Sequence, residues 1–555
     1  MKLSGADIIV KSLIKQGVEV VFGYPGGQII DVYDSLYKYQ NEIHHVLTAH
    51  EQGASHAADG YARASGRVGV VLATSGPGAT NLITGIATAY LDSIPMVAIT
   101  GNVLQSQIGT DSFQEIDITG ITLPITKHNY FVSRAEDLAD IIKEAFELAI
   151  SGRPGPVLID VPKDVQKAII EWEEGERFEK ALPFSAKDMR IKQAVKLINA
   201  CKKPYVYFGG GIINSGANDL LIELSRKIDA PIGCSLMGIS AIPTNQPLFL
   251  GMEGMHGKYA SSMAMKNADL IIALGARFND RATGNVAKFP KQAKIVHIDI
   301  DGSELNKNLE ASVGLRGDIK LTLEKLIPQI KTSKKIAWWK EIDSFRQTQW
   351  QTEDLREGLT PKNVLSTLNK FLNPDYPVVT DVGQHQMWAA QYVNFSKNRK
   401  FITSGGLGTM GFGMGAAMGA SYSTGKKSVL ITGDGCFGMN LNELATAVTY
   451  NVPLVVVLFN NGVLGMVRQW QTLFFDKHYS NTVLNRKTNF VELCKAFGAD
   501  AERVDDLSQL DGAYERAFNS KVPYVIEVMV DKDEFVLPML PPGGSFDDII
   551  TKVGK

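Results

Sequence analysis

Thr432-Gly433-Asp434-Gly435-Cys436, followed further along the chain by Asn460-Asn461, is the stretch that decides the fold class. Each part directly follows an apolar, β-branched run of strand length, at residues 428–431 and 454–459. Parallel α/β sheets bind their ligands beyond the carboxyl ends of the strands. Two strands that end in glycine and polar residues of this kind therefore predict a doubly wound sheet with a ligand site at one edge.

The residue types in these two stretches suit a phosphate held through a metal ion. Glycine has no Cβ, so Gly433 and Gly435 let the backbone approach phosphate oxygens. The Asp434 carboxylate and the Asn461 amide oxygen are hard ligands of the kind that Mg²⁺ takes together with phosphates and water. An isolated Gly-Asp-Gly is more often a tight turn, and an Asn pair a helix cap. Their placement after two apolar strands favours a metal-bridged diphosphate site.

Similar strand-like runs recur in three groups along the chain. The runs are residues 68–73, 96–100 and 156–160, then 204–208, 270–275 and 295–300, and finally 377–380, 428–431, 454–459 and 524–529. Largely apolar strands predict parallel sheets that are covered on both faces. Charged stretches at 164–190 and 330–358 separate the groups and are typical of linkers packed on a surface. We therefore expect an α/β protein with three doubly wound domains and mainly parallel sheets, at 1–165, 190–330 and 358–540.

Composition excludes several classes of partner. Lys and Arg number 57 and Asp and Glu 59, a formal charge of −2, so bulk charge attracts neither nucleic acid nor an anionic membrane. No apolar run approaches the roughly 20 residues of a membrane helix, and no targeting segment is visible at the N-terminus. The four cysteines are widely spaced and form no disulfide framework. We expect a cytoplasmic protein.

The Gly-Asp-Gly and Asn-Asn pattern resembles the thiamine diphosphate signature, and the likeness extends along nearly the whole chain to the acetohydroxyacid synthase (acetolactate synthase) large-subunit family. Together the matching segments are highly specific, although no single one would be. They are FGYPGG (22–27), HEQG (50–53), ATSGPGATN (73–81), GTDSFQE (109–115), SGRPGP (151–156), GARFNDR (275–281), GQHQMW (383–388), GLGTMG (406–411) and GMVRQW (465–470).

The resemblance implies a transferase that uses thiamine diphosphate, Mg²⁺ and a non-redox FAD. Such an enzyme decarboxylates pyruvate and transfers the hydroxyethyl group to a second pyruvate or to 2-ketobutyrate, giving 2-acetolactate or 2-aceto-2-hydroxybutyrate for valine and isoleucine biosynthesis. One alternative is another thiamine diphosphate-dependent 2-keto acid decarboxylase or carboligase, including the catabolic acetolactate synthase. A second is a non-catalytic FAD- or nucleotide-binding protein with the same fold. The presence of Glu51, Asp434 and Asn461 argues against the second.

The same resemblance implies roles for five residues in the reaction. Glu51 hydrogen-bonds the aminopyrimidine ring and so allows the cofactor to lose its C2 proton. Arg281 receives the carboxylate of the second 2-keto acid, a task that suits a planar bidentate donor. Trp470 walls the pocket that prefers the ethyl group of 2-ketobutyrate to a methyl group. Gln114 and Lys163 line the entrance.

The cofactor ligands are also implied by the resemblance. Asp434, Asn461 and the carbonyl of Val463 would bind magnesium. The thiamine diphosphate contacts would be Gly26, Pro77, Asn81, Gln384, His385, Gly408, Met410, Gly435, Cys436, Met439 and Met466, with Met410 keeping the cofactor bent. The FAD contacts would be Arg153, Gly209, Gly210, Gly211, Ser235, Leu236, Met255, His256, Gly257, Gly275, Arg277, Asn279, Asp299, Ile300 and Asp318.

Three positions depart from the family pattern. Cys436 stands where the family usually has Ser, Asn279 where it has Asp, and Leu104 where it has Pro. The family places each thiamine site between two subunits, with the glutamate from one chain and the diphosphate cradle from the other. We therefore expect a homodimer or a tetramer, and a small regulatory subunit as a further partner.

Overall fold

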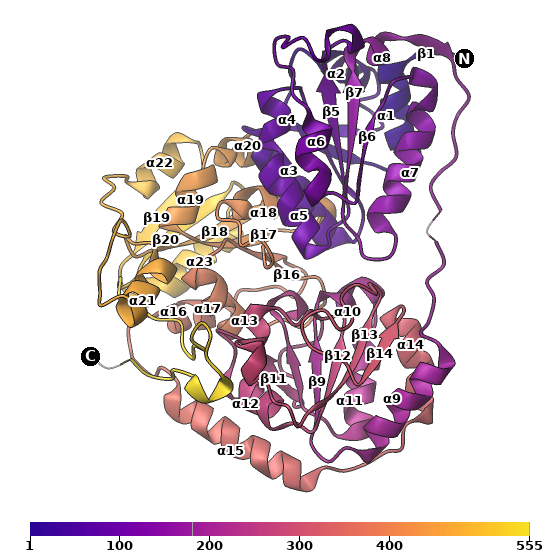
Figure 1. The fold of residues 1–555 in the computed structure, drawn as a ribbon. Helices are drawn as coiled ribbons and strands as arrows, with labels where there is room; N and C mark the ends of the chain where they lie inside the picture. Colours follow the sequence, from indigo (N-terminus) through magenta and orange to yellow (C-terminus); the bar gives the residue numbers. More distant parts are fainter. Residues whose placement is uncertain (180, 554–555) are drawn as a thin grey trace.

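The computed structural model describes residues 1–179 and 181–553 and contains three six-stranded parallel sheets, each flanked by helices (Figure 1). The chain completes one sheet before it begins the next. This arrangement confirms the predicted α/β class with three doubly wound domains. The central strands are buried along almost their whole length, as parallel sheets with two covered faces require.

The first domain has the strand order β3-β2-β4-β5-β7-β6. The order reverses between β2 and β4, because the chain moves outward from β2 to β3 and then crosses back to β4. The strands are β2 (Val20–Gly23), β3 (His44–Leu47), β4 (Gly69–Ala73), β5 (Met96–Asn102), β6 (His128–Phe131) and β7 (Pro156–Pro162). The helices are α1 (Gly5–Lys15), α2 (Ile30–Lys38), α3 (Glu51–Ser65), α4 (Pro77–Asn81), α5 (Ile83–Asp92), α6 (Ile118–Thr122), α7 (Leu138–Ile150) and α8 (Lys163–Lys167). A short antiparallel pair, β1 (Lys2–Ser4) and β8 (Ile169–Glu171), joins the two ends of the domain.

The middle domain has the order β11-β10-β9-β12-β13-β14 and reverses between β9 and β12. Its strands are β9 (Pro204–Phe208), β10 (Ile232–Cys234), β11 (Phe249–Met252), β12 (Leu270–Leu274), β13 (Lys294–Asp299) and β14 (Val313–Arg316). Its helices are α9 (Asp188–Ala200), α10 (Gly210–Ser215), α11 (Asn218–Ile228), α12 (Tyr259–Asn267), α13 (Asp280–Thr283) and α14 (Ile319–Leu326).

The third domain has the order β16-β15-β17-β18-β20-β19 and reverses between β15 and β17. Its strands are β15 (Val378–Thr380), β16 (Phe401–Ile402), β17 (Ser428–Gly433), β18 (Leu454–Asn460), β19 (Asp500–Val504) and β20 (Tyr524–Met529). Its helices are α16 (Pro361–Leu368), α17 (Gln384–Tyr392), α18 (Phe412–Thr424), α19 (Asp434–Asn440), α20 (Glu443–Thr449), α21 (Gly465–Phe474), α22 (Phe490–Ala496) and α23 (Leu510–Asn519).

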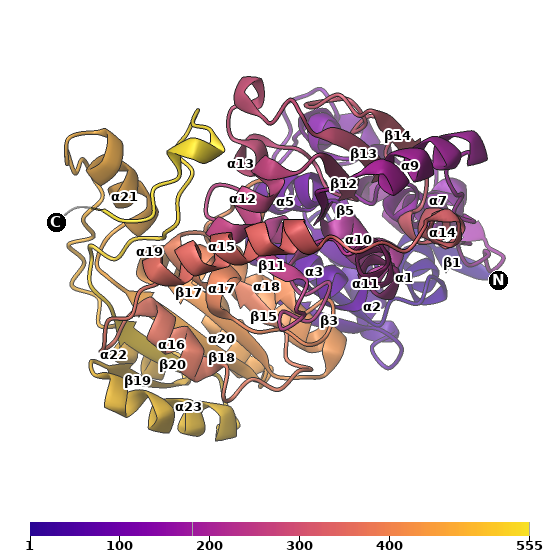
Figure 2. The same cartoon turned by 90° about the horizontal axis from the view of Figure 1, so that it is seen from below.

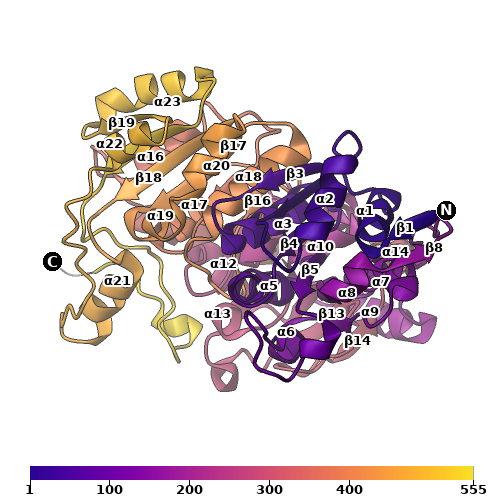
Figure 3. The ribbon, with the colours of Figure 1, turned by 90° about the horizontal axis from the view of Figure 1, so that it is seen from above.

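Helices α3 and α18 hold the first and third domains together, and they lie side by side from the front and from above (Figures 1 and 3). Glycines make the close crossing possible. A Cβ on Gly415 would lie 2.8 Å from the Cβ of His56, and a Cβ on Gly60 would overlap the carbonyl oxygen of Ala416. The two helix backbones are therefore in direct contact at the crossing.

The middle and third domains are joined by a helix and by the C-terminal segment. Helix α15 (Ile336–Thr352) runs along the outside of the molecule (Figure 2), and Trp338 donates its indole N–H to the carbonyl of Pro204 at 3.0 Å. Beyond β20 the chain returns to the middle domain, where the Leu540 amide donates to the carbonyl of Met255 at 2.7 Å. The three domains thus enclose a common centre.

All ten predicted strands are present, but the sequence did not indicate the edge strands of the three sheets, the interior strands β2 and β10, or helix α15. Helix α15 lies in the polar stretch 330–358, and within the helix only Trp338 and Ile342 are buried, too few to reveal a helical period. Across the described residues, we find no helix that combines the length and the apolar character of a membrane span.

Candidate active site

The residues predicted to bind cofactors gather in pairs of loops, each pair beyond the carboxyl ends of the two strands where a sheet reverses its order. A doubly wound sheet leaves a crevice at that point. The paired loops hold Gly26 and Pro77 in the first domain, Gly209 and Gly275 in the middle domain, and Gln384 and Asp434 in the third. One binding geometry is therefore repeated three times.

Glu51 is the first residue of α3 and is half-buried. His50 caps the helix, because its Nδ1 accepts the backbone N–H of Gln52 at 3.0 Å. The Asn81 amide donates to Glu51 Oε2 at 3.0 Å, and a Cβ on Gly78 would lie 3.3 Å from Oε1. One carboxylate oxygen is thus anchored, while the other faces a turn with no side chain.

Gln114 and Lys163 contact the loops that follow β4 and β2, respectively. Gln114 adopts a φ of 64°, and its Cβ would lie 2.9 Å from a Cβ on Gly76. Lys163 donates to the carbonyl of Gly27 and lies 3.5 Å from the Asp31 carboxylate. We name this group the first-domain cluster; it consists of Gly26, Glu51, Pro77, Asn81, Gln114 and Lys163.

Asp434 begins α19 at the end of β17, and Asn461 follows the adjacent strand β18. Asp434 is buried, and this burial raises the pKa of its carboxyl group to about 6. Asn461 Oδ1 accepts the Val463 amide at 3.2 Å. The described residues contain no group of three or more His, Cys, Asp or Glu side chains that could hold a metal ion by itself. One carboxylate with amide and carbonyl oxygens fits Mg²⁺ that shares a diphosphate, rather than an all-protein metal cage.

Gln384 and His385 begin α17 at the end of β15. His385 is buried, its Nε2 has no hydrogen-bond partner among the described residues, and burial lowers its pKa to about 3. Gln384 Oε1 accepts from the Asn461 side chain at 3.4 Å, and a Cβ on Gly433 would lie 2.9 Å from His385 Nδ1. A buried, unpartnered imidazole nitrogen beside side-chain-free backbone fits an anionic ligand such as a diphosphate.

Met410 lies in the loop between β16 and α18. Its Cε would lie 3.7 Å from a Cβ on Gly435, so the methionine faces the start of α19. Asp381 fixes the loop, because its Oδ1 accepts the amide of Gly411 at 2.8 Å. The Cys436 thiol donates to the carbonyl of Val382 at 3.0 Å. We name this group the third-domain cluster; it consists of Gln384, His385, Gly408, Met410, Asp434, Gly435, Cys436, Asn461 and Val463.

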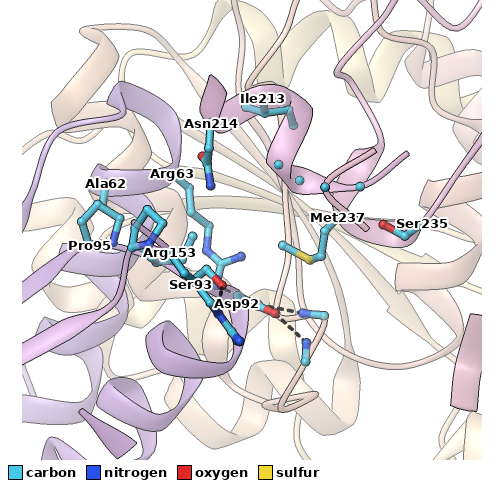
Figure 4. Close-up of a pocket in the computed structure, with 18 of the residues that line it drawn as sticks. Ala62, Arg63, Asp92, Ser93, Pro95, Arg153, Ile213, Asn214, Ser235 and Met237 are labelled. Atoms are coloured by element: carbon cyan, nitrogen blue, oxygen red, sulfur yellow. Dashed lines mark hydrogen bonds and ion pairs between the residues drawn. The ribbon is translucent and has the colours of Figure 1, made fainter. Parts of the chain in front are cut away.

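A pocket of about 1730 Å³ opens where the three domains meet, and Figure 4 shows part of its wall. Most of the residues predicted to contact FAD line it, together with parts of the predicted substrate and thiamine diphosphate sites. These lining residues are Arg153, Gly209, Gly210, Gly211, Ser235, Leu236, Met255, His256, Gly275, Arg277, Asn279, Arg281, Asp299, Ile300, Asp318, Gly408, Met410, Met466 and Trp470. Gly257 is not among them, and Met439 is 57% exposed.

The middle-domain side of this pocket has the features of a dinucleotide site. The Gly211 amide donates to the carbonyl of Gly275 at 3.1 Å, and Gly275 has a φ of +54°, which favours glycine. His256 is buried with an unpartnered Nδ1, while Asn279 is occupied in capping α13. The volume of the pocket, the glycine backbone along its wall and the free Nδ1 of His256 fit FAD.

Arg281 and Trp470 meet at this pocket although they come from different domains. The Arg281 guanidinium carbon lies 5.7 Å from the centre of the Trp470 ring, and Nη1 lies 3.4 Å from the sulfur of Met255. The Arg281 side chain lines the pocket and is 57% exposed, so its charge is accessible to a ligand. A carboxylate that enters there would find both a cation and an apolar wall.

The first-domain and third-domain clusters do not join within one chain. No hydrogen bond or ion pair between the described residues links Glu51, Asn81 or Lys163 to Asp434 or His385. Sequence reasoning also missed three buried carboxylates around these clusters, namely Asp92, Asp381 and Glu443. Asp381 could have been noticed as an acid directly after a strand, whereas Asp92 and Glu443 lie in helices with no such signal.

Comparison with known proteins supports the whole-chain resemblance. Three domain families of thiamine pyrophosphate enzymes match: the N-terminal TPP binding domain at residues 3–121, the central domain at 191–326 and the C-terminal TPP binding domain at 381–528. The acetolactate synthase isozyme 3 large subunit of Escherichia coli is 44% identical, over 99% of this chain and 98% of that protein. The acetolactate synthase large subunit of Corynebacterium glutamicum is 45% identical, over 100% and 91%. The E. coli isozyme 2 large subunit is 44% identical, over 99% and 100%. The chain therefore belongs to the acetolactate synthase large-subunit family of thiamine pyrophosphate enzymes.

Proposed function

We propose that this protein decarboxylates pyruvate and transfers the resulting two-carbon unit to a second pyruvate or to 2-ketobutyrate, as an acetolactate synthase of branched-chain amino acid biosynthesis. The observation that carries the proposal is the meeting of Arg281 and Trp470 at the mouth of the central pocket. This pair suits a 2-keto acid, because the guanidinium binds the carboxylate and the indole packs on the short alkyl group.

The third-domain cluster would hold thiamine diphosphate and Mg²⁺. Asp434, Asn461 and the Val463 carbonyl would bind the metal, and His385 and the amide of Gly435 would meet the diphosphate. When bound, thiamine diphosphate supplies the electron sink that decarboxylation requires.

The chain's own residues would orient the reactants and move one proton. Glu51, held by Asn81, would hold a proton against the aminopyrimidine ring of the cofactor. Arg281 would fix the acceptor acid in one orientation, and Trp470 would limit the size of its alkyl group. The apolar walls of the pocket would exclude water. If water entered, the two-carbon unit would be released as an aldehyde instead of being transferred.

The FAD proposal separates this protein from the catabolic acetolactate synthases. It is supported by the fit of the middle-domain loops, in particular the close approach of Gly211 to Gly275 and the free Nδ1 of His256. The same flavin would have no redox role in the synthesis.

Assembly is part of the proposal. No hydrogen bond or ion pair between the described residues links the first-domain cluster to the third-domain cluster within one chain, and exposed apolar side chains such as Phe113, at 83%, and Met439, at 57%, lie near them. A homodimer, or a tetramer built from it, would bring the first-domain cluster of one chain to the third-domain cluster of another. A small regulatory subunit, a cytoplasmic location and the lack of nucleic-acid and membrane partners stay predictions.

The test combines the absorption spectrum of the purified protein with a product assay. We expect a flavin spectrum and, with thiamine diphosphate, Mg²⁺ and pyruvate, the formation of acetolactate. Glu51→Gln should keep cofactor binding and lose product formation, while Gln193→Glu on the exposed face of α9 should change neither. Acetaldehyde as the sole product of the wild-type protein would contradict the proposal and favour a simple decarboxylase. Acetolactate without bound flavin would favour the catabolic type.

A further inference from the structure

Glu443 is a buried carboxylate of the third domain that contacts the first domain directly before Glu51. It is the first residue of α20, and its side chain is fully buried. Oε1 accepts the backbone N–H of His50 at 3.0 Å, and Oε2 accepts the backbone N–H of Ala49 at 3.1 Å. The hydroxyl of Thr446 donates to Oε2 at 2.7 Å. One side chain thus binds two consecutive amides from another domain.

These two bonds determine how the chain enters α3. A carboxylate that binds consecutive amides fixes the peptide between them, and both amides lie within two residues of Glu51. The contact is tight, because a Cβ on Gly53 would overlap Glu443 Oε1. Since Asn81 anchors the Glu51 side chain at its other end, Glu51 is held through its backbone by Glu443 and through its carboxylate by Asn81.

The two acids also share an electrostatic environment. Burial raises the pKa of Glu443, and the negative charge of Glu51 raises it further, while the bonds from Thr446, Ala49 and His50 act in the opposite direction. Two carboxyl groups that influence each other in a partly dry region are more costly than a neutral anchor would be. An amide or hydroxyl side chain could have joined the domains at lower cost.

We propose that Glu443 is a positioning residue for Glu51, which holds the start of α3 so that the Glu51 carboxylate meets the aminopyrimidine ring of thiamine diphosphate. This inference rests on the proposed function. Glu443 of the third domain would thus orient Glu51 of the first domain for its proton transfer.

The experiment measures the exchange of the C2 hydrogen of bound thiamine diphosphate for deuterium, by rapid acid quench and NMR, with the complete holoenzyme. Glu443→Gln keeps the shape of the side chain, but turns an N–H₂ group toward one of the two amide donors. Glu443→Asp keeps the charge but shortens the side chain by one methylene, so the carboxylate lies farther from the two amides. A displacement of about 1 Å can cost about 100-fold in such a step, so we expect exchange to slow about 10- to 100-fold in both variants. The dissociation constant of the cofactor should change less than about 3-fold, because the diphosphate cradle is untouched.

Asp269→Asn is the matched control. Asp269 also accepts two consecutive amides, those of Lys202 and Lys203 at 2.7 and 2.9 Å, but in the middle domain. The Asp269→Asn variant should leave the rate of C2 exchange unchanged even if the substitution lowers the melting temperature. Normal exchange in a folded Glu443→Gln or Glu443→Asp protein would overturn the positioning role, and so would equal slowing by Asp269→Asn. If the wild-type protein shows no C2 exchange above that of free cofactor, the proposed function itself fails.

Discussion

Arg63 and Asp92 form a buried ion pair at the junction of the three domains, with Arg63 Nη2 2.9 Å from Asp92 Oδ2 (Figure 4). Asp92 also accepts the amides of Gly405 and Gly406 at 3.0 and 2.7 Å. Arg63 donates to the carbonyl of Thr403 at 2.8 Å. Two side chains of the first domain therefore hold the start of the third-domain loop that carries Met410.

Asp92→Asn should destabilise the protein and loosen this loop. In this variant Asp59 is the remaining acidic partner of the buried Arg63. The NH₂ group of the new asparagine would also face the backbone N–H of Gly405 or Gly406, which the carboxylate now accepts. Removing one partner of a buried pair costs about 3 kcal/mol or more. Urea unfolding should show this loss, and thiamine diphosphate should bind more weakly. Asp188→Asn, which breaks an exposed pair with Lys325, is the control and should change little. Unaltered cofactor affinity would separate Asp92 from the positioning of Met410.

Arg281→Lys should raise the KM for the acceptor 2-keto acid more than it lowers kcat. Lysine keeps the charge but loses the bidentate donors, and hydrogen bonds to charged groups are worth about 1.5–3 kcal/mol, or roughly 10-fold or more in KM. Arg346→Lys offers a matched control, because Arg346 lies over Trp339 at 5.4 Å away from the pocket. Steady-state kinetics would contradict the assignment if both variants behaved alike.

Trp470→Leu should lower the preference for 2-ketobutyrate over pyruvate. The indole wall is proposed to contact the extra methylene, which is worth about 1–3 kcal/mol in an apolar pocket, so the ratio of the two products should fall about 10-fold or more. Competition between the two acceptors, followed by product analysis, measures the ratio directly. Trp339→Leu on α15 should leave it unchanged. A preserved ratio in Trp470→Leu would place the specificity elsewhere.

The sequence predicted the parts of this fold that depend on local patterns. The strands β17 and β18 on either side of Asp434 are apolar and continuous, so their burial could be predicted directly. Asp92 and Glu443 could not be found in this way. Each binds backbone amides of another domain, more than 300 residues away in the chain, and its own neighbours carry no trace of that partner. The same holds for the glycines of α3 and α18. They allow the two helices to approach closely, and this contact is seen only in the three-dimensional structure.

Folding stability should fall as the pH decreases from about 7 to 5, in part because of His56. The His56 ring is buried and accepts or donates no hydrogen bond within the described part of the chain, and burial lowers its pKa to about 3. Below the unfolded pKa of about 6.5 the unfolded chain binds a proton that the folded chain does not, which costs about 1.4 kcal/mol per pH unit. His56→Leu should reduce the slope of unfolding free energy against pH by about this amount. His128→Leu, at an exposed position on β6, should not, and equal slopes in the wild type and His56→Leu would contradict the prediction.

Gly419→Ala should weaken the packing of the first domain on the third. A Cβ at this position would overlap the carbonyl oxygen of Ala57, which belongs to the backbone of α3 and cannot rotate away. Alanine gains about 1 kcal/mol in helix propensity over glycine. Overpacking costs about 1–3 kcal/mol even where side chains can adjust, and here the obstacle is backbone, so the net effect should be a loss. Gly175→Ala is the control, because its Cβ would lie 3.5 Å from the Cβ of Ala139, an ordinary contact. Calorimetry should show a lower melting temperature for Gly419→Ala alone; an equal or higher one would mean that α3 and α18 can separate at little cost.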